Sequence, residues 1–258
     1  MIKTIITENV VLCSDIHIND TQREISESFY NWLEFVCIKA KNRPDWLMIL
    51  GDLFDAWIGD DFLDHQYLGT YISKLTDILC SIKKSGTKIG IMHGNRDFLI
   101  GKVFCNKVGG ELLPEKVLLK IKNSNFSYLL MHGDQLCTDD KDHQKFRSLV
   151  LSDTWKKNFL NKDIEERLKI AQELRNSSMQ AKSKKSAGIM DVNLVESENQ
   201  LNLTSAQTLI HGHTHRPGEF ELSNGKKRIV LPDWRFVNKV SLGGGLLLDS
   251  SGVTHSSL

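Results

Sequence analysis

Five short polar groups along the chain combine the carboxylate, amide and imidazole side chains that bind metal ions. They are Asp15-Ile16-His17, Gly51-Asp52, Gly94-Asn95-Arg96-Asp97, His132 and Gly212-His213-Thr214-His215. Nitrogen and oxygen donors without thiolate suit Mn²⁺, Fe²⁺ or Zn²⁺, and the oxygen content favours Mn²⁺. Two such ions about 4 Å apart can activate a hydroxide between them for in-line attack on phosphorus. Together, the groups indicate a two-metal phosphoesterase.

Each polar group follows, directly or after one residue, a short apolar segment that is typical of a buried strand. These segments are Val10–Cys13, Trp46–Leu50, Lys88–Met92, Phe126–Met131 and Thr208–Ile210. The intervening residues 24–41 and 68–83 have the apolar periodicity of helices. Alternating strands and helices predict a mainly parallel sheet, whose ligands gather at the carboxyl ends of the strands. Because alternate residues of an extended segment point to the same side, Asp15 and His17 are expected to share one metal.

The remaining sequence departs from this alternation in two places. Residues 139–202 are strongly charged and helical in pattern, so we expect a core of residues 1–138 and 203–258 with a helical insertion at 139–202 above the strand ends. After His215 the chain has short strand segments and turns at residues 223–225 and 243–245. That pattern predicts an antiparallel sheet closing the domain.

Composition is that of an ordinary folded α/β protein. The 258 residues carry 25% charged side chains and a net charge of +1, which gives no overall attraction to nucleic acid. The five cysteines are scattered without a CxxC pair, which favours reduced thiols in the cytoplasm. Nowhere do about 18 apolar residues run together, so no spanning helix is expected.

The ordered polar groups resemble those of the calcineurin-like metallophosphoesterases across most of the chain. The resemblance implies an α/β fold of four layers, αββα, with the insertion forming a lid. It implies that Asp15, His17 and His215 bind one metal, that Asn95, His132 and His213 bind the second, and that Asp52 bridges both. It also assigns catalytic roles to Asp52, Asn95, Arg96, Asp97 and His213.

Longer stretches resemble one branch of that family, the UDP-2,3-diacylglucosamine pyrophosphatases of lipid A synthesis. They are residues 51–61, 94–101, 131–140 and 211–217. The resemblance implies hydrolysis to UMP and 2,3-diacylglucosamine 1-phosphate by a hydroxide bridging two divalent ions. It implies an apolar chamber under the lid and substrate contacts from Asn95, Arg96, Asp140, Arg175, Ser178, Lys182, Lys185 and His213. It further implies a monomer bound peripherally at the cytoplasmic face of the inner membrane, without a nucleic-acid partner.

Arg96 supports this branch on chemical grounds. In many relatives the residue after the motif's asparagine is a histidine, which can protonate a poor leaving group, whereas an arginine cannot usefully release its proton. A phosphate monoester, with a second pKa of about 6, leaves without protonation. Arg96 is then expected to neutralise phosphate charge. The alternative is a structural ion pair with Asp97.

Two departures from the branch and three alternative functions remain open. His143 stands where the branch usually has a tyrosine, and Lys182 where it often has an asparagine; His143 could supply a positive or proton-transfer group. His93 and His211 are expected to pack beside the ligands, and His65 and His255 to lie on the surface. The alternative functions are another nucleotide pyrophosphatase or phosphodiesterase, a nuclease, and a non-catalytic interaction module.

Overall fold

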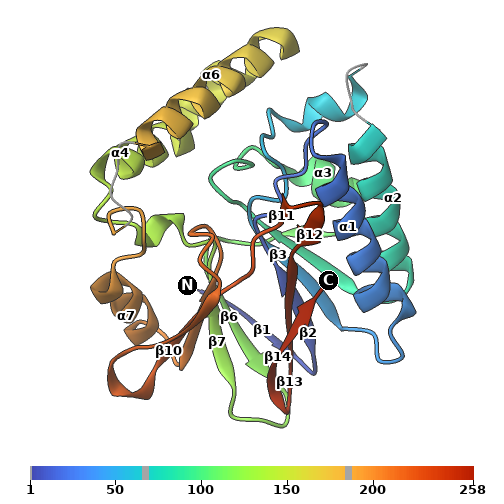
Figure 1. The fold of residues 1–258 in the computed structure, drawn as a ribbon, viewed down its shortest axis with the longest axis vertical. Coiled ribbons are helices and arrows are strands. Elements are labelled where there is room, and N and C mark those ends of the chain that lie inside the picture. Colours follow the sequence, from blue (N-terminus) through green and yellow to red (C-terminus); the bar gives the residue numbers. More distant parts are fainter. Residues whose placement is uncertain (1, 66–69, 184–187) are drawn as a thin grey trace.

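Two six-stranded sheets lie face to face in the computed structural model, which describes residues 2–65, 70–183 and 188–258, with the side chains of 70, 179, 181–183 and 224 left out (Figure 1). The first sheet has the order β14-β13-β2-β3-β4-β5. Its strands are β2 (Val10–Cys13), β3 (Trp46–Leu50), β4 (Lys88–Met92), β5 (Glu111–Leu112), β13 (Gly244–Asp249) and β14 (Gly252–Ser257). Strands β2 to β5 are parallel, whereas β13 runs antiparallel to both β2 and β14.

The second sheet is mixed and has the order β1-β6-β7-β8-β10-β9. Its strands are β1 (Lys3–Thr7), β6 (Val117–Ile121), β7 (Ser127–Leu130), β8 (Thr208–His211), β9 (Gly218–Glu221) and β10 (Lys227–Val230). Strands β7 and β8 run parallel, so two of the five expected strands lie in this sheet rather than in one common parallel sheet.

Alternation along the strands builds separate cores on the two sides of the first sheet. Leu12 and Met48 point into a core shared with the second sheet, while the neighbouring Val11 and Leu47 point to the outer helices. A strand buried on both faces is continuously apolar, which explains the unbroken apolar segments in the sequence.

Helices cover the outer faces of both sheets and complete the expected four layers. α1 (Arg23–Leu33), a π-helical turn (Glu34–Lys39), α2 (Thr70–Lys84) and α3 (Lys102–Lys107) cover the first sheet (Figure 1). α7 (Leu194–Asn202) covers the second, because Leu201 packs with Leu129 and Leu209. Short 3₁₀ turns occur at Asp60–Asp64, Asp134–Leu136 and Ser223–Gly225.

Three helices of the charged segment stand over one end of the two sheets. They are α4 (Lys141–Leu151), α5 (Asp153–Leu160) and α6 (Ile164–Ser183), and we call them the lid (Figure 1). Asp140 accepts a hydrogen bond from the His143 backbone N–H, 3.0 Å away, at the start of α4, and Ser152 caps α5 in the same way. The division of the chain at residues 139 and 202 remains a prediction, although α7 within that range packs on the second sheet.

Antiparallel pairing after His215 is confirmed for β9 with β10 and for β13 with β14, but the prediction that these strands form one sheet is wrong. Strand β10 joins the second sheet in parallel with β8, whereas β13 and β14 extend the first sheet. Between them, β11 (Arg235–Val237) and β12 (Val240–Leu242) form a separate two-stranded ribbon. Short strands with turns between them predict pairing but do not determine the partner strand, because either sheet edge can supply it.

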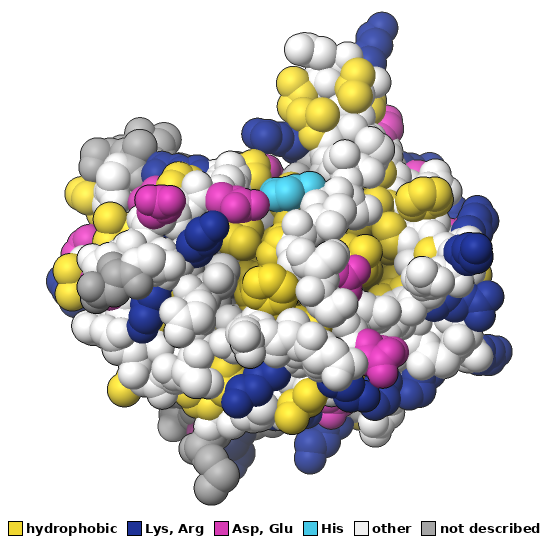
Figure 2. All heavy atoms as spheres, turned by 90° about the horizontal axis from the view of Figure 1, so that it is seen from below, with side chains coloured by type: hydrophobic (Ala, Val, Ile, Leu, Met, Phe, Trp, Pro, Cys, Tyr) yellow, Lys and Arg dark blue, Asp and Glu magenta, His cyan; other side chains and the backbone are white. Residues whose placement is uncertain are grey.

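The surface opposite the lid carries no single strip of basic residues in view. Figure 2 shows this face with hydrophobic side chains gathered near its centre and Lys and Arg side chains dispersed toward its rim. Among the described helices, none is long and apolar enough to cross a membrane.

Candidate metal centre

The predicted ligands lie in the turns that follow β2, β3, β4, β7 and β8, so both sheets contribute to one site. Five of them have the left-handed backbone conformation that non-glycine residues seldom adopt: φ is 55° at Asp15, 53° at His17, 52° at Asp52, 65° at His213 and 53° at His215. Strained backbone of this kind gathers at functional sites. The expectation that Asp15 and His17 share an extended segment is therefore wrong, although their side chains do come together.

The first cluster consists of Asp15, His17 and His215, whose donor atoms lie within 4.8 Å of one another. The Nε2 atoms of His17 and His215 are 3.3 Å apart, and His215 Nε2 is 3.5 Å from Asp15 Oδ1. Asp15 is fully buried and accepts hydrogen bonds from the His213 backbone N–H and the Ser14 hydroxyl. These contacts fix the carboxylate of Asp15 while leaving it beside the two imidazoles.

The second cluster consists of Asn95, His132 and His213. Asn95 Oδ1 lies 2.7 Å from His213 Nδ1 and 3.2 Å from His132 Nε2. The other ring nitrogen of His132, Nδ1, donates to the Leu50 carbonyl at 2.8 Å. This bond selects the tautomer that leaves Nε2 unprotonated for a metal.

Asp52 lies between the two clusters. Its Oδ2 is 3.7 Å from His17 Nε2, and its Oδ1 is 3.7 Å from His132 Nε2. Gly94 makes this placement possible, because a Cβ there would lie 2.1 Å from Asp52 Oδ1.

The donor set fits two divalent cations. Donors about 2.1 Å from a common metal lie about 3 to 3.5 Å apart. Three of the separations within the two clusters, 3.2, 3.3 and 3.5 Å, fall in this range, and the fourth, 2.7 Å, is slightly shorter. Imidazole nitrogens that face each other beside a buried carboxylate are typical of a metal site.

Charges in the cluster are strongly coupled. Burial lowers the pKa of His215, but hydrogen bonds to Asp15 and Asp233 outweigh it and raise that pKa to about 10. Burial also lowers the pKa of His132, but the negative charges of Asp52 and Asp15 outweigh it and raise that pKa to about 9. Burial raises the pKa of Asp52 to about 7. Without cations, protons on the imidazoles balance the carboxylates.

Comparison with known proteins agrees with this geometry. Residues 9–217 match the calcineurin-like phosphoesterase family. The chain belongs to this family. It is 40% identical to a UDP-2,3-diacylglucosamine hydrolase of Chromohalobacter salexigens over 87% of this chain and 88% of that protein. It is 39% identical to the protein of the same name from Haemophilus influenzae over 93% of this chain and 94% of that protein.

Asp97 of this calcineurin-like phosphoesterase lies behind the site rather than in it. Its buried carboxylate accepts hydrogen bonds from the backbone N–H groups of Asp52, Leu53, Phe54 and Gly94 at 2.8 to 3.3 Å. Asp97 thereby holds the turns after β3 and β4 together. Arg96 donates its backbone N–H to Asp52 Oδ1, and no ion pair joins its side chain to Asp97 among the described residues.

An apolar chamber opens beside the metal ligands of the phosphoesterase. Its empty volume is about 1190 Å³, including space open to solvent, and it is lined by apolar side chains from the turns and from all three lid helices. Asp140, Arg175 and Ser178 line the chamber, as do Asn95 and Arg96. Arg175 forms an ion pair with Asp55. The Lys182 side chain and all of Lys185 lie outside the described part of the structure.

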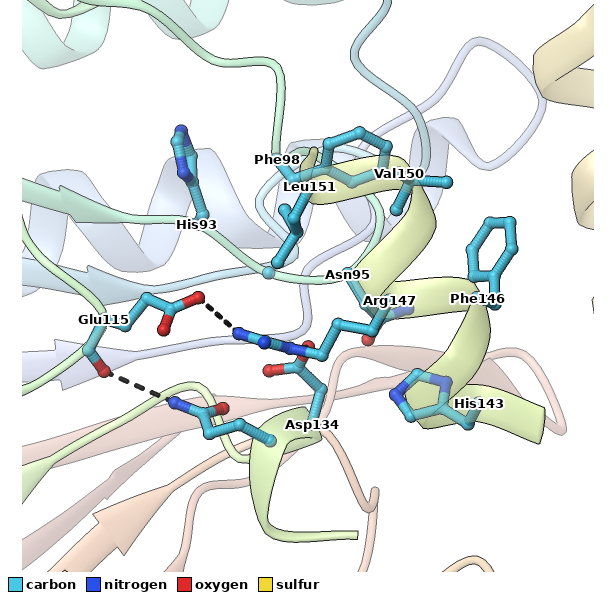
Figure 3. Close-up of a pocket in the computed structure, with 12 residues that line it drawn as sticks. His93, Asn95, Phe98, Glu115, Asp134, His143, Phe146, Arg147, Val150 and Leu151 are labelled. Atoms are coloured by element: carbon cyan, nitrogen blue, oxygen red, sulfur yellow. Dashed lines mark hydrogen bonds and ion pairs between the residues drawn. The ribbon is translucent and has the colours of Figure 1, made fainter. Parts of the chain in front are cut away.

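A smaller cavity of about 450 Å³ lies beneath α4 (Figure 3). Arg147 reaches from α4 to ion pairs with Asp134 and Glu115, which attach this lid helix to the core. His143 lies on the same helix, and its ring centroid is 5.4 Å from that of His213. His143 therefore stands next to a predicted metal ligand.

Two residues at the site were missed from the sequence. Asp233 Oδ2 lies 3.4 Å from His215 Nδ1, where it orients the imidazole, and Ser14 donates to Asp15. Ser14 precedes a predicted ligand, whereas Asp233 gave no signal because it lies far along the chain in an unpatterned turn.

His93 and His211 turn away from the cluster, since His93 Nε2 contacts the Ile100 carbonyl and His211 Nδ1 contacts the Gly212 carbonyl.

Proposed function

We propose that this metal-dependent hydrolase cleaves the pyrophosphate bond of UDP-2,3-diacylglucosamine, giving UMP and 2,3-diacylglucosamine 1-phosphate. The observation that carries the proposal is the apolar chamber that opens directly onto Asn95 and Arg96. A soluble nucleotide needs no such chamber, whereas two acyl chains do. The relatives named for this reaction, at about 40% identity along most of the chain, support the same substrate.

Two divalent ions, which we propose to be Mn²⁺, would activate water and neutralise charge on the phosphates. Asp15, His17 and His215 would hold one ion, and Asn95, His132 and His213 the other, with Asp52 shared. Asp97 would position the turns that carry Asp52 and Asn95 through its backbone hydrogen bonds.

Arg96 would bind the pyrophosphate at the boundary between chamber and metal ligands. Its guanidinium stays charged throughout turnover and offers a planar fork of donors to phosphate oxygens. No general acid is required at this position, because the departing phosphate monoester is already a stable anion near neutral pH. Asp140, Arg175, Ser178, Lys182 and Lys185 are proposed to contact the glucosamine-phosphate head.

The lid is proposed to meet the membrane surface peripherally, with the protein as a monomer on the cytoplasmic face of the inner membrane. Leu149 and Leu160 are exposed on lid helices that also carry lysines. Such a combination supports reversible interfacial binding. Cosedimentation with anionic phospholipid vesicles, weakened in the Leu149→Ser variant, is the expected result.

Incubation of the metal-loaded protein with UDP-2,3-diacylglucosamine tests the reaction. We expect release of UMP that disappears in the Asp52→Ala variant and in metal-free protein. Turnover of a generic phosphodiester without release of UMP would preserve the family chemistry and refute this substrate. Failure to bind two metal ions per chain would instead favour an interaction module.

A further inference from the structure

Two cavities meet at the metal centre. Besides the apolar chamber and the cavity beneath α4 there is a third cavity, which we call the outer cavity, with an empty volume of about 810 Å³ that includes space open to solvent. The apolar chamber and the outer cavity share Asp55, Asn95, Arg96 and Arg175. Beyond the metal ligands, the outer cavity is lined by Gln22 and Ile25 at the start of α1 and by Trp234, Arg235 and Phe236 at the ribbon.

We infer that the outer cavity is a pyrimidine nucleoside 5′-monophosphate subsite and that Phe236 stacks on the base. This inference rests on the proposed function, because a pyrophosphate diester has two ends. If the acyl chains occupy the apolar chamber, the nucleoside must leave the metal centre on the other side. The outer cavity borders the predicted ligands His17, His213 and His215, none of which lines the apolar chamber.

Phe236 is placed to stack on a base rather than to pack in a core. Its side chain is 43% exposed, on a ribbon that belongs to neither large sheet. The chain that leads to Phe236 is held by the buried Trp234, which packs edge-on against Phe29 and Trp32 with ring centroids 5.0 and 5.5 Å apart. The Ser28 hydroxyl also bonds Ser241 of β12 at 2.7 Å, which attaches the ribbon to α1 (Figure 1).

Polar groups of the outer cavity match the remainder of such a nucleotide. The side-chain oxygen of Gln22, Oε1, accepts a hydrogen bond from the Asn19 side chain, 3.2 Å away, which orients the side-chain amide, while Nε2 of Gln22 donates to no described residue. That amide can donate to a uracil carbonyl. The Arg235 side chain is half exposed, with its Nε 3.9 Å from Asp233 Oδ2, and can meet ribose or phosphate oxygens.

Binding of UMP gives a test that does not depend on turnover. Proton NMR of UMP with protein loaded with Zn²⁺, which is diamagnetic, should show upfield ring-current shifts of the uracil H5 and H6 protons. The Phe236→Leu variant keeps an apolar side chain but removes the ring, so the shifts should be lost. The matched control is Val240→Ala on the paired strand, which lies outside the cavity lining and should retain them.

Kinetics provide the second readout. In Phe236→Leu the KM for UDP-2,3-diacylglucosamine should rise between about fivefold and a hundredfold, the range for loss of one base–aromatic stack. The Val240→Ala control should keep the wild-type KM for the same substrate. Circular dichroism should show the same fold in both variants.

The outcomes separate this inference from the proposed function. Ring-current shifts lost in Phe236→Leu, without wild-type turnover of the lipid substrate, would refute the reaction and keep the subsite. Turnover with the same KM in Phe236→Leu and Val240→Ala would refute the subsite and keep the reaction. Absence of any UMP shift with the wild-type protein would also overturn the subsite.

Discussion

Protons and metal ions compete for the same imidazoles in the metal centre. The pKa of His215 is raised to about 10 and that of His132 to about 9, so both rings are protonated in the metal-free protein at pH 7. A group whose pKa is raised holds its proton until the pH passes the new value, and metal binding must displace it. We therefore expect metal affinity to rise between pH 6 and pH 9, by about tenfold per pH unit for each proton displaced.

Isothermal titration calorimetry in buffers of different ionisation enthalpy measures this proton release directly. His17 should contribute nothing, because burial lowers its pKa to about 3 and the ring is already neutral. The same affinity at pH 6 and pH 9 would contradict the proposed charge balance.

Asp52 and Asp97 are both buried aspartates of the motifs, yet their substitutions should have opposite effects on stability. The pKa of Asp52 is raised to about 7, so the folded state disfavours its ionised form increasingly between pH 4 and pH 7. In metal-free protein at pH 8, Asp52→Asn should be as stable as the wild type or more stable, although inactive. Asp97→Asn places an amide NH₂ against backbone N–H donors, so the free energy of unfolding should fall by at least about 2 kcal/mol.

Urea denaturation of both variants at pH 4 and pH 8 distinguishes the two roles. A stable but inactive Asp97→Asn protein would instead give Asp97 a direct part in catalysis.

The residue types at the site followed from the sequence, but their conformations did not. Carboxylate, amide and imidazole groups after apolar strands predicted which residues would meet. Whether Asp15 and His17 are extended or left-handed depends on contacts with distant turns, such as the bond from the Asp15 backbone N–H to the Gly51 carbonyl. The Asp233 contact likewise depends on tertiary structure, because no local pattern relates residue 233 to residue 215.

At the level of elements, Arg167 fixes α6, the last of the three lid helices. It is 2% exposed, and one guanidinium nitrogen donates to the Ile58 carbonyl at 2.7 Å and to Asp61 at 2.8 Å. Gly59 leaves room for it, since a Cβ there would lie 2.6 Å from the guanidinium. On the same helix, Ala171 and Leu174 line the chamber. Arg167 therefore sets the position of one chamber wall without touching the metal ligands.

Arg167→Met should lower the free energy of unfolding by about 2 kcal/mol, less than for a fully buried pair because Asp61 is half exposed. The KM for the diacylated substrate should rise, whereas turnover of bis(p-nitrophenyl) phosphate should not change. The matched control is Lys162→Met, which removes the exposed pair with Glu166 and should cost less than about 0.5 kcal/mol. Equal effects of the two substitutions on KM would contradict the positioning role of Arg167.

Helical periodicity predicted lid helices but not how they attach. A buried arginine cannot be recognised in a charged helix such as α6, because exposed and buried arginines look the same without the partner. The partner, Asp61, comes from a turn more than a hundred positions earlier in the chain. For the same reason α7 was grouped with the lid, although its apolar residues pack on the second sheet.

In the whole molecule, the metal centre joins the two sheets. Asp15, Asp52 and Asn95 come from turns after strands of the first sheet, and His132 and His213 from turns after strands of the second. The shared apolar core holds the sheets together along their length, but at this end buried carboxylates and imidazoles face one another. Cations bound there would form coordination bonds to ligands from both sheets, in place of the partly balanced carboxylate and imidazole charges.

Metal binding should therefore raise the thermal stability of the whole protein. A ligand at a thousand times its Kd stabilises the folded state by about 4 kcal/mol, which corresponds to about 10 °C in Tm for a chain of this size. Differential scanning calorimetry with Mn²⁺ and with EDTA should show this shift in the wild type. His255→Ala, on the exposed edge strand β14, should show it too, whereas His215→Ala should lose much of it. A full shift in His215→Ala would place the stabilising ion elsewhere, because that variant lacks one donor of the first cluster while its sheets and apolar core are unchanged.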